Sequence, residues 1–94
     1  MKVTAIFHGV LANYIGVKRA DFDLPEEALY SDLLTGIGQR FSQNLPDKLW
    51  DKDQNIFKAP ILATKDERHL TSLEVNTPLK KGEEIKFFLM LAGG

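Results

Sequence analysis

The chain has 94 residues, a length that fits one domain and leaves no room for a second. Hydrophobic residues make up 44% of it and charged residues 27%, which is typical of a folded globular domain and argues against disorder. The formal net charge is -1, so no basic excess supports nucleic-acid binding. The absence of cysteine excludes disulfides, thiolate metal sites and a cysteine nucleophile.

Hydropathy gives no sign of a membrane or export segment. No apolar run approaches the roughly 20 residues needed to cross a bilayer. The first residues lack the apolar region of a signal peptide. We therefore expect a cytoplasmic protein without a membrane partner.

The first quarter of the chain has the pattern of two antiparallel strands. In residues 2–8, Val3, Ala5 and Phe7 alternate with more polar positions, which predicts a strand. Residues 18–24 alternate in the same way and predict a second strand. Residues 9–16 are expected to be a short connection, bracketed by glycines, that makes the two strands a hairpin.

A single helix is predicted over residues 28–42, where large apolar side chains recur at helical spacing. Pro25 ends the preceding strand, and Glu26 and Glu27 suit the positive end of a helix. Gly36 and Gly38 each weaken a helix by about 1 kcal/mol relative to alanine. This helix must therefore be stabilised by packing on a sheet.

The second half of the chain predicts a long loop and further strands. Residues 43–58 are expected to form a loop with at most one helical turn, pinned to the sheet by Trp50. Residues 59–64 predict a short buried strand, residues 69–73 a brief strand or turn, and residues 85–91 the last strand. A right-handed crossover through the helix would make the first and last strands parallel neighbours. The fold class is therefore α+β, a mixed sheet of four to five strands packed on one main helix.

The last strand has two apolar sides. Phe87, Leu89 and Leu91 fall on one side, and Phe88 and Met90 fall on the other. One set should face the helix. The other is either more core or a surface for a partner, and the sequence leaves both possibilities open.

Few residues are candidates for metal binding or acid–base chemistry. With only His8 and His69 and no cysteine, we expect no metal site. The carboxylates between residues 21 and 27 are expected to be solvated at a strand edge and helix start. No nucleophile–base set can be assembled, so we do not expect a self-sufficient enzyme.

Several segments together resemble one known family. They are residues 7–11 (FHGVL) with Gly16, residues 32–34 (DLL), residues 77–85 (TPLKKGEEI), and residues 87–88 followed by Ala92-Gly93-Gly94. In order and spacing the chain is similar to the molybdopterin synthase small subunit and thiamine sulfur carrier family. These proteins are ubiquitin-like sulfur carriers with a β-grasp fold. The long segment 43–58 resembles the extended-loop subgroup.

The resemblance implies a carrier function centred on the C-terminus. Gly94 would be the attachment point of an adenylate and then of a thiocarboxylate, with Gly93, Ala92, Leu91, Met90 and Phe88 contacting a partner. That partner would be an adenylyltransferase of the ubiquitin-activating type, which uses ATP and Mg²⁺, so no cofactor is expected on this chain. A large subunit of molybdopterin synthase would be a further partner. Glycines suit a narrow enzyme channel because they lack Cβ, and residues 91–94 would reach ~13 Å when extended as a flexible tail.

The residues leave other functions open. Leu89-Met90 stand where the molybdopterin-type tail has a proline pair, so the acceptor of the sulfur could belong to thiamine, cysteine or tungsten-cofactor synthesis. A ubiquitin-like modifier of other proteins would share the activation step. A plain interaction domain with an irrelevant tail is the third class.

Overall fold

A four-stranded sheet organises the molecule. The structure, a computed structural model, describes residues 1–58, 61–65 and 73–90. The strands β1 (Lys2–Phe7), β2 (Arg19–Asp23), β5 (Ile61–Thr64) and β6 (Glu84–Leu89) lie in the order β2-β1-β6-β5. The β1–β6 pair is parallel and the two outer pairs are antiparallel. The predicted mixed sheet with parallel first and last strands is confirmed.

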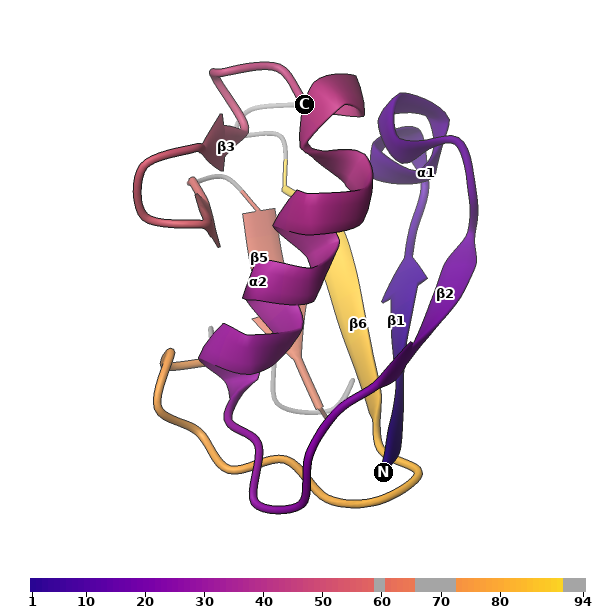
Figure 1. Cartoon of the computed structure of the whole chain (residues 1–94). Coiled ribbons are helices and arrows are strands. Elements are labelled where there is room, and N and C mark those ends of the chain that lie inside the picture. The colour runs from indigo at the N-terminus through magenta and orange to yellow at the C-terminus, as the bar shows by residue number, and fades with distance from the viewer. Residues whose placement is uncertain (59–60, 66–72, 91–94) are drawn as a thin grey trace.

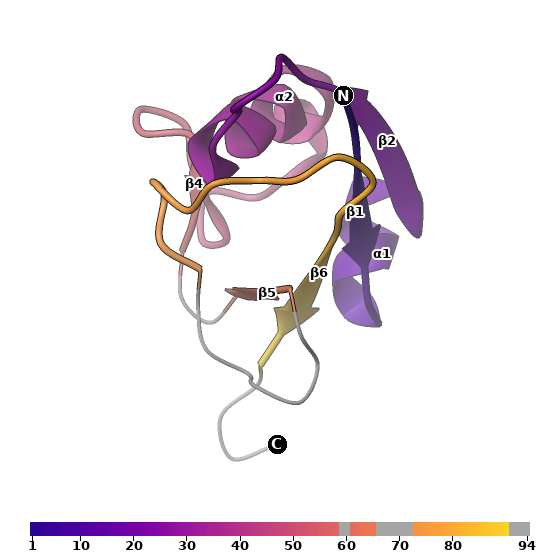
Figure 2. The same cartoon turned by 90° about the horizontal axis from the view of Figure 1, so that it is seen from below.

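One helix, α2 (Tyr30–Phe41), covers one face of this sheet (Figure 1). Seen from below, the sheet curves around it (Figure 2). Val3, Ala5 and Phe7 of β1 point towards the helix and are buried in one core cluster with Ile85 and Phe87 of β6. The alternation in residues 2–8 therefore identified the core side of β1 correctly.

The start of α2 differs from the prediction. Glu26 and Glu27 lie in the turn before the helix, where Glu27 adopts a positive φ of 67°. The helix begins at Tyr30, and the carboxylate of Asp32 accepts a hydrogen bond from the backbone N–H of Leu29 at 2.7 Å. Asp32 thus provides the negative charge at the helix start that was assigned to the two glutamates.

The two helix glycines permit close contacts. A Cβ on Gly36 would lie 2.9 Å from the Phe22 ring on β2. A Cβ on Gly38 would lie 2.8 Å from Asn55 Oδ1 and 2.9 Å from Trp50 Cζ2. The loss of helix propensity at these positions is therefore the cost of bringing α2 close to its neighbours.

A short helix, α1 (Val10–Ile15), replaces the simple connection predicted for residues 9–16. Leu11 and Ile15 are buried, and the side-chain amide of Asn44 donates to the Ile15 carbonyl at 2.9 Å. Gly9 and Gly16 bound it with φ of 58° and 97°. Six residues are too few for a clear helical period, which is why the sequence pattern missed it.

The long loop also contains more structure than predicted. A 3₁₀ turn, η1 (Ser42–Asn44), is followed by a small hairpin of β3 (Trp50–Asp51) and β4 (Ile56–Phe57). Asp51 Oδ1 accepts the N–H groups of Asp53 and Gln54 and shapes the hairpin turn. Trp50 is 1% exposed and packs on Phe57, whose ring lies 5.2 Å from that of Phe87. Trp50 therefore pins this segment to α2 and, through Phe57, to the sheet.

The last predicted strands are shorter than expected. The strand predicted at 59–64 begins at Ile61 in β5, and residues 59–60 lie outside the described residues. The strand or turn predicted at 69–73 lies outside them as well, except for Leu73. The strand predicted at 85–91 is β6, which ends at Leu89.

Candidate functional site

The residues predicted to carry the chemistry follow β6. Gly94, Gly93, Ala92 and Leu91 lie outside the described residues. Phe88 is in β6, and Met90 is the last residue described. Because β1 and β6 are parallel, the chain leaves β6 at the same end of the sheet at which α1 follows β1. The structure thus places the end of β6 close to α1, which β6 contacts (Figure 1).

The two apolar sides of β6 have different environments. Ile85 and Phe87 are fully buried in the core, and Leu89 packs against it. Phe88 is half-buried and Met90 is 48% exposed, and neither belongs to the core cluster. The set formed by Phe88 and Met90 is therefore not additional core.

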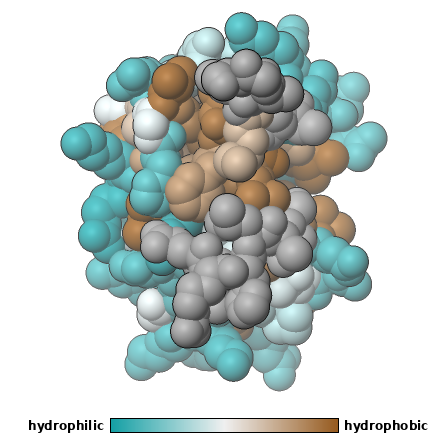
Figure 3. All heavy atoms as spheres, turned by 180° about the vertical axis from the view of Figure 1, so that it is seen from behind, coloured by the Kyte–Doolittle hydropathy of each residue, from teal (hydrophilic) through white to brown (hydrophobic). Residues whose placement is uncertain are grey.

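An apolar patch occupies part of the sheet face that lies away from α2, where Arg19 and Lys86 are the strand neighbours of Ile6. Phe88 is paired with Leu62 of β5, and Ile6 lies on the same side of β1. We call Ile6, Leu62, Phe88 and Met90 the outer-face patch; none of the four is in the core cluster. Figure 3 shows apolar residues in the middle of this face with hydrophilic residues around them. An apolar patch on a sheet face, rimmed by polar residues, is a feature of protein interfaces.

His8 lies against this patch. Its ring stacks on Phe88 with 4.4 Å between centroids and 6° between planes, and its backbone N–H donates to the Phe87 carbonyl at 3.0 Å. Its Nε2 is buried and has no hydrogen-bond partner among the described residues. The predicted place of His8 on the mixed side of the first strand is correct. The stacking was not predicted, although the alternation of Ile6 and His8 places both on one side.

The other end of the outer face is charged and internally paired. Lys2 lies 3.3 Å from Asp21, and Arg19 lies 3.5 Å from Glu84. Thr4 Oγ1 donates to Asp21 at 2.7 Å, and this hydrogen bond, with the nearby cations, holds the pKa of Asp21 below 3.8. The carboxylates of Asp21 and Glu84 are thus paired with neighbouring side chains on the exposed sheet face, as expected for solvated charges on a strand.

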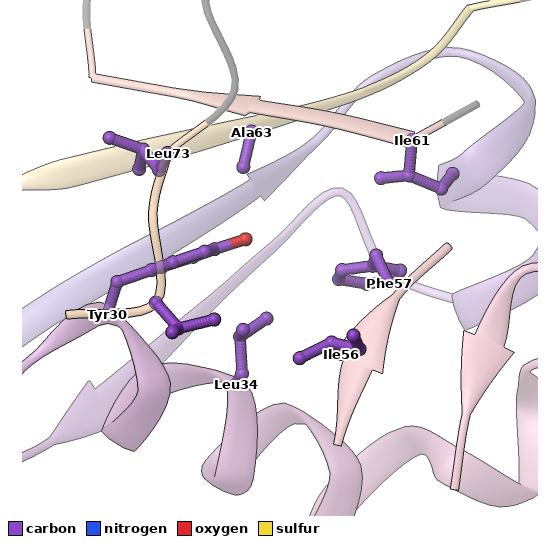
Figure 4. Close-up of a pocket in the computed structure, with 8 residues that line it drawn as sticks. Tyr30, Leu34, Ile56, Phe57, Ile61, Ala63 and Leu73 are labelled. Atoms are coloured by element: carbon purple, nitrogen blue, oxygen red, sulfur yellow. The ribbon is translucent and has the colours of Figure 1, made fainter. Parts of the chain in front are cut away.

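A small cavity lies between α2, β4 and β5 (Figure 4). It measures about 180 Å³ and is lined by Tyr30, Leu34, Ile56, Phe57, Ile61, Ala63, Leu73 and Val75. Among the described residues that line it, Tyr30 is the one that can ionise, and burial raises the pKa of that phenol. These residues offer no nucleophile with an adjacent base, so we interpret the cavity as a gap in the packing.

Two other kinds of site, a metal centre and a membrane span, are absent from residues 1–58, 61–65 and 73–90. No group of three histidine, aspartate or glutamate side chains there is arranged to hold a metal ion. Over the same ranges, the helices are all too short or too polar to span a bilayer. The outer-face patch beside the start of the tail is therefore the candidate functional site.

Comparison with known proteins identifies the fold. No family model matches the sequence, and no curated protein matches it. The crystal structure of SAMP1 from Haloferax volcanii matches with a TM-score of 0.79 and 16% identity, covering 100% of both chains. A crystal structure of H. volcanii small archaeal modifier protein 1 gives 0.75 and 14%, covering 96% of this chain and 98% of that one. The molybdopterin converting factor subunit 1 from Pyrococcus furiosus, itself described as putative, gives 0.65 and 20%, covering 97% and 99%.

These matches span nearly the whole chain, so they concern the complete arrangement of helix and sheet. The chain has the ubiquitin-like β-grasp fold predicted from its sequence. The resemblance that the sequence motifs indicated is thus confirmed at the level of the fold.

Proposed function

We propose that this chain is a sulfur carrier protein whose Gly94 is adenylated and thiocarboxylated by a partner enzyme. The observation that carries this proposal is the position of the outer-face patch. In a ubiquitin-like β-grasp fold, an apolar surface outside the core adjoins the end of β6, from which the sequence runs directly into Gly93-Gly94. The partner enzyme would bind the folded body of the chain while the C-terminal tail enters its active site.

The proposed chemistry has two balanced steps. A carboxylate oxygen of Gly94 attacks the α-phosphorus of ATP, and pyrophosphate leaves to give an acyl-adenylate. Hydrosulfide from a sulfur source then attacks the carbonyl carbon, and AMP leaves to give the thiocarboxylate. The first step is needed because a carboxylate is a poor acyl donor. The partner supplies Mg²⁺, phosphate binding and positioning.

The residues of this chain would act by binding and steric fit. Phe88 and Met90 would contact an adenylyltransferase of the ubiquitin-activating type in the cytoplasm. Leu91 and Ala92 would lead the tail into the channel of that enzyme, and Gly93 and Gly94 would pass through it because they lack Cβ. On this proposal the chain performs no catalysis and holds no cofactor of its own.

Intact-mass analysis tests the proposal. The chain is incubated with the purified adenylyltransferase of its own organism, ATP, Mg²⁺ and a sulfur source. We expect a mass increase equal to the replacement of one oxygen by one sulfur. A variant without Gly94 and one extended beyond it should remain unchanged. Modification of either variant at the wild-type level would overturn the proposal.

We place the sulfur donation in molybdenum cofactor biosynthesis, with this chain as the small subunit of molybdopterin synthase. The likeness to the putative molybdopterin converting factor subunit 1 of Pyrococcus furiosus supports this pathway over thiamine, cysteine or tungsten-cofactor synthesis. The thiocarboxylated chain should form a stable complex with a molybdopterin synthase large subunit in size-exclusion chromatography. Absence of that complex, with thiocarboxylation intact, would redirect the proposal to another acceptor.

A modifier function is the second candidate, favoured by the likeness to small archaeal modifier protein 1. In that case activated Gly94 would be transferred to lysine side chains of other proteins. Mass spectrometry of cell extracts would then find isopeptide bonds from Gly94 to lysine, and these would disappear when Gly94 is deleted. A carrier used only for sulfur would give none.

A further inference from the structure

Exposed apolar side chains concentrate on α1. Among the described residues, five large hydrophobic side chains are strongly exposed: Val10 (49%), Tyr14 (37%), Val17 (40%), Val75 (49%) and Met90 (48%). Three of these five lie between residues 10 and 17. Isolated exposed apolar residues are ordinary, but three within eight residues concentrate exposed apolar area on one short segment.

Two of these side chains are neighbours on α1. Val10 and Tyr14 are one helical turn apart and therefore lie on one side of the helix. Val17 follows the left-handed Gly16 just beyond the helix and borders an open hollow of about 320 Å³ with Ala12, Asn13 and Lys18. Leu11 and Ile15 are buried in the core. We call Val10, Tyr14 and Val17 the α1 surface.

The fold does not use the α1 surface. None of its three residues belongs to the core cluster or packs against it. The helix is held instead by Leu11, Ile15 and the Asn44 hydrogen bond to the Ile15 carbonyl. Exposed apolar side chains that the fold does not use are available for contact with a partner.

The charged residues around the α1 surface indicate what kind of partner surface would fit it. Residues 10–17 carry no charged side chain. Lys18 follows them, and Lys48 Nζ lies 6.0 Å from the centre of the Tyr14 ring. In the described part of the chain, neither lysine forms an ion pair. A complementary surface therefore has an apolar centre flanked by carboxylates.

The α1 surface follows the candidate site closely along the chain. Val10 is two residues beyond His8, which stacks on Phe88 in the outer-face patch. Both surfaces lie at the end of the sheet where the chain leaves β6 (Figure 1). We propose that the α1 surface is a second docking surface for the adenylyltransferase that receives the tail, bound by an apolar, carboxylate-flanked region of that enzyme. This inference rests on the proposed carrier function.

Steady-state kinetics test it. ATP–pyrophosphate exchange is measured with the purified adenylyltransferase and increasing concentrations of the wild-type chain or the triple variant V10S/Y14S/V17S. The triple variant should raise the KM for the chain about tenfold or more with kcat nearly unchanged, because docking and not chemistry is weakened. Val75→Ser, at the same exposure as Val10 but in the segment between β5 and β6, is the matched control and should leave KM unchanged.

A charge-reversal pair tests the same surface without removing apolar contacts. The K18E/K48E variant should raise KM, and the difference from wild type should shrink with added salt. Lys81→Glu, in the turn before β6, is the control for a general charge effect. The fold of every variant is verified by circular dichroism and by the fluorescence of Trp50, which is the one tryptophan of the chain.

The outcomes separate the two proposals. If the wild-type chain supports no exchange, the carrier proposal and this inference both fail. If it supports exchange and the triple variant has the wild-type KM, only the α1 inference fails. A fall in kcat at unchanged KM, or an equal rise in KM for Val75→Ser, would also overturn it.

Discussion

Gly38 fixes the contact between α2 and the β3–β4 hairpin. An alanine there would gain about 1 kcal/mol of helix propensity. Its Cβ, however, would lie within 3 Å of both Asn55 and Trp50. Overpacking of this kind costs about 1–3 kcal/mol. We therefore expect Gly38→Ala to lower the urea midpoint and change the fluorescence of Trp50.

The exposed Gln39 supplies the control for that measurement. Gln39→Ala adds helix propensity on the same helix without a new contact, so the midpoint should stay or rise slightly. A Gly38→Ala variant as stable as Gln39→Ala would contradict the tight contact.

Thr4 determines the ionisation of Asp21 on the charged end of the outer face. The Thr4 hydroxyl is the largest cause of the lowered pKa of Asp21. A carboxyl whose pKa is lower in the folded state contributes stability above its unfolded value, here 3.8, and loses it as the pH falls through the folded value. Thr4→Val should bring the pKa of Asp21 closer to 3.8, measured by NMR titration of the side-chain carboxyl.

The stability of the same variant should also depend less on pH below about pH 4. The reason is that the pKa of Asp21 then differs less between the folded and the unfolded chain. Thr35→Val is the control, because the Thr35 hydroxyl donates to the Ser31 carbonyl on α2. If Thr35→Val shifted the pKa of Asp21 as much as Thr4→Val does, the Thr4 hydroxyl would not be the cause of the lowered pKa.

At the scale of elements, Arg40 joins α2 to the edge strand β2. Its guanidinium donates to the Asp21 carbonyl at 2.8 Å and lies 4.5 Å from the centre of the Phe22 ring. Lysine retains the charge but not the planar stacking, so Arg40→Lys should cost about 1 kcal/mol. Arg19→Lys, in an exposed ion pair with Glu84, should cost almost nothing. Urea unfolding of both variants measures the difference, and equal losses would count against this role of Arg40.

Elements with a full period of apolar residues could be predicted from the sequence. Val3, Ala5 and Phe7 gave the core side of β1, and residues 28–42 gave α2 within two residues at either end. The elements that were missed are α1 and the β3–β4 hairpin. Helix α1 has only six residues and is held by the hydrogen bond from Asn44 to the Ile15 carbonyl. The hairpin has only two residues in each strand and is held by the packing of Trp50 on Phe57. No local pattern encodes such contacts.

The candidate site was predictable in part for the same reason. Alternation along the last strand separated Phe88 and Met90 from Phe87, and the structure agrees. The contributions of Ile6, Leu62 and His8 depend on which strands become neighbours. That information lies in the pairing of β1, β5 and β6 and not in any one segment.

At the scale of the whole molecule, Phe87 connects the elements. Its ring lies 5.4 Å from Phe7, 6.3 Å from Tyr30 and 5.2 Å from Phe57, which belong to β1, α2 and β4. Phe87→Ala should cost about 3–5 kcal/mol, a large share of the 5–15 kcal/mol typical of a domain. Calorimetry should show one cooperative transition at a much lower midpoint.

The neighbouring Phe88 provides the matched comparison, because it lies on the other face and contacts His8. Phe88→Ala should cost clearly less stability than Phe87→Ala and should impair adenylation by the partner more than its stability loss explains. Equal losses in the two variants would mean that the faces of β6 are not distinct as described.

The central position of β6 has a consequence for the synthesis of the protein. Of the strands described here, β6 is translated last, yet it lies between β1 and β5. Until it emerges from the ribosome, β1 and β2 form a two-stranded hairpin of marginal stability. An interrupted translation product therefore lacks both a finished sheet and Gly94, the residue that we propose is modified. On the proposed function, premature fragments would therefore be excluded from modification without any separate proofreading step.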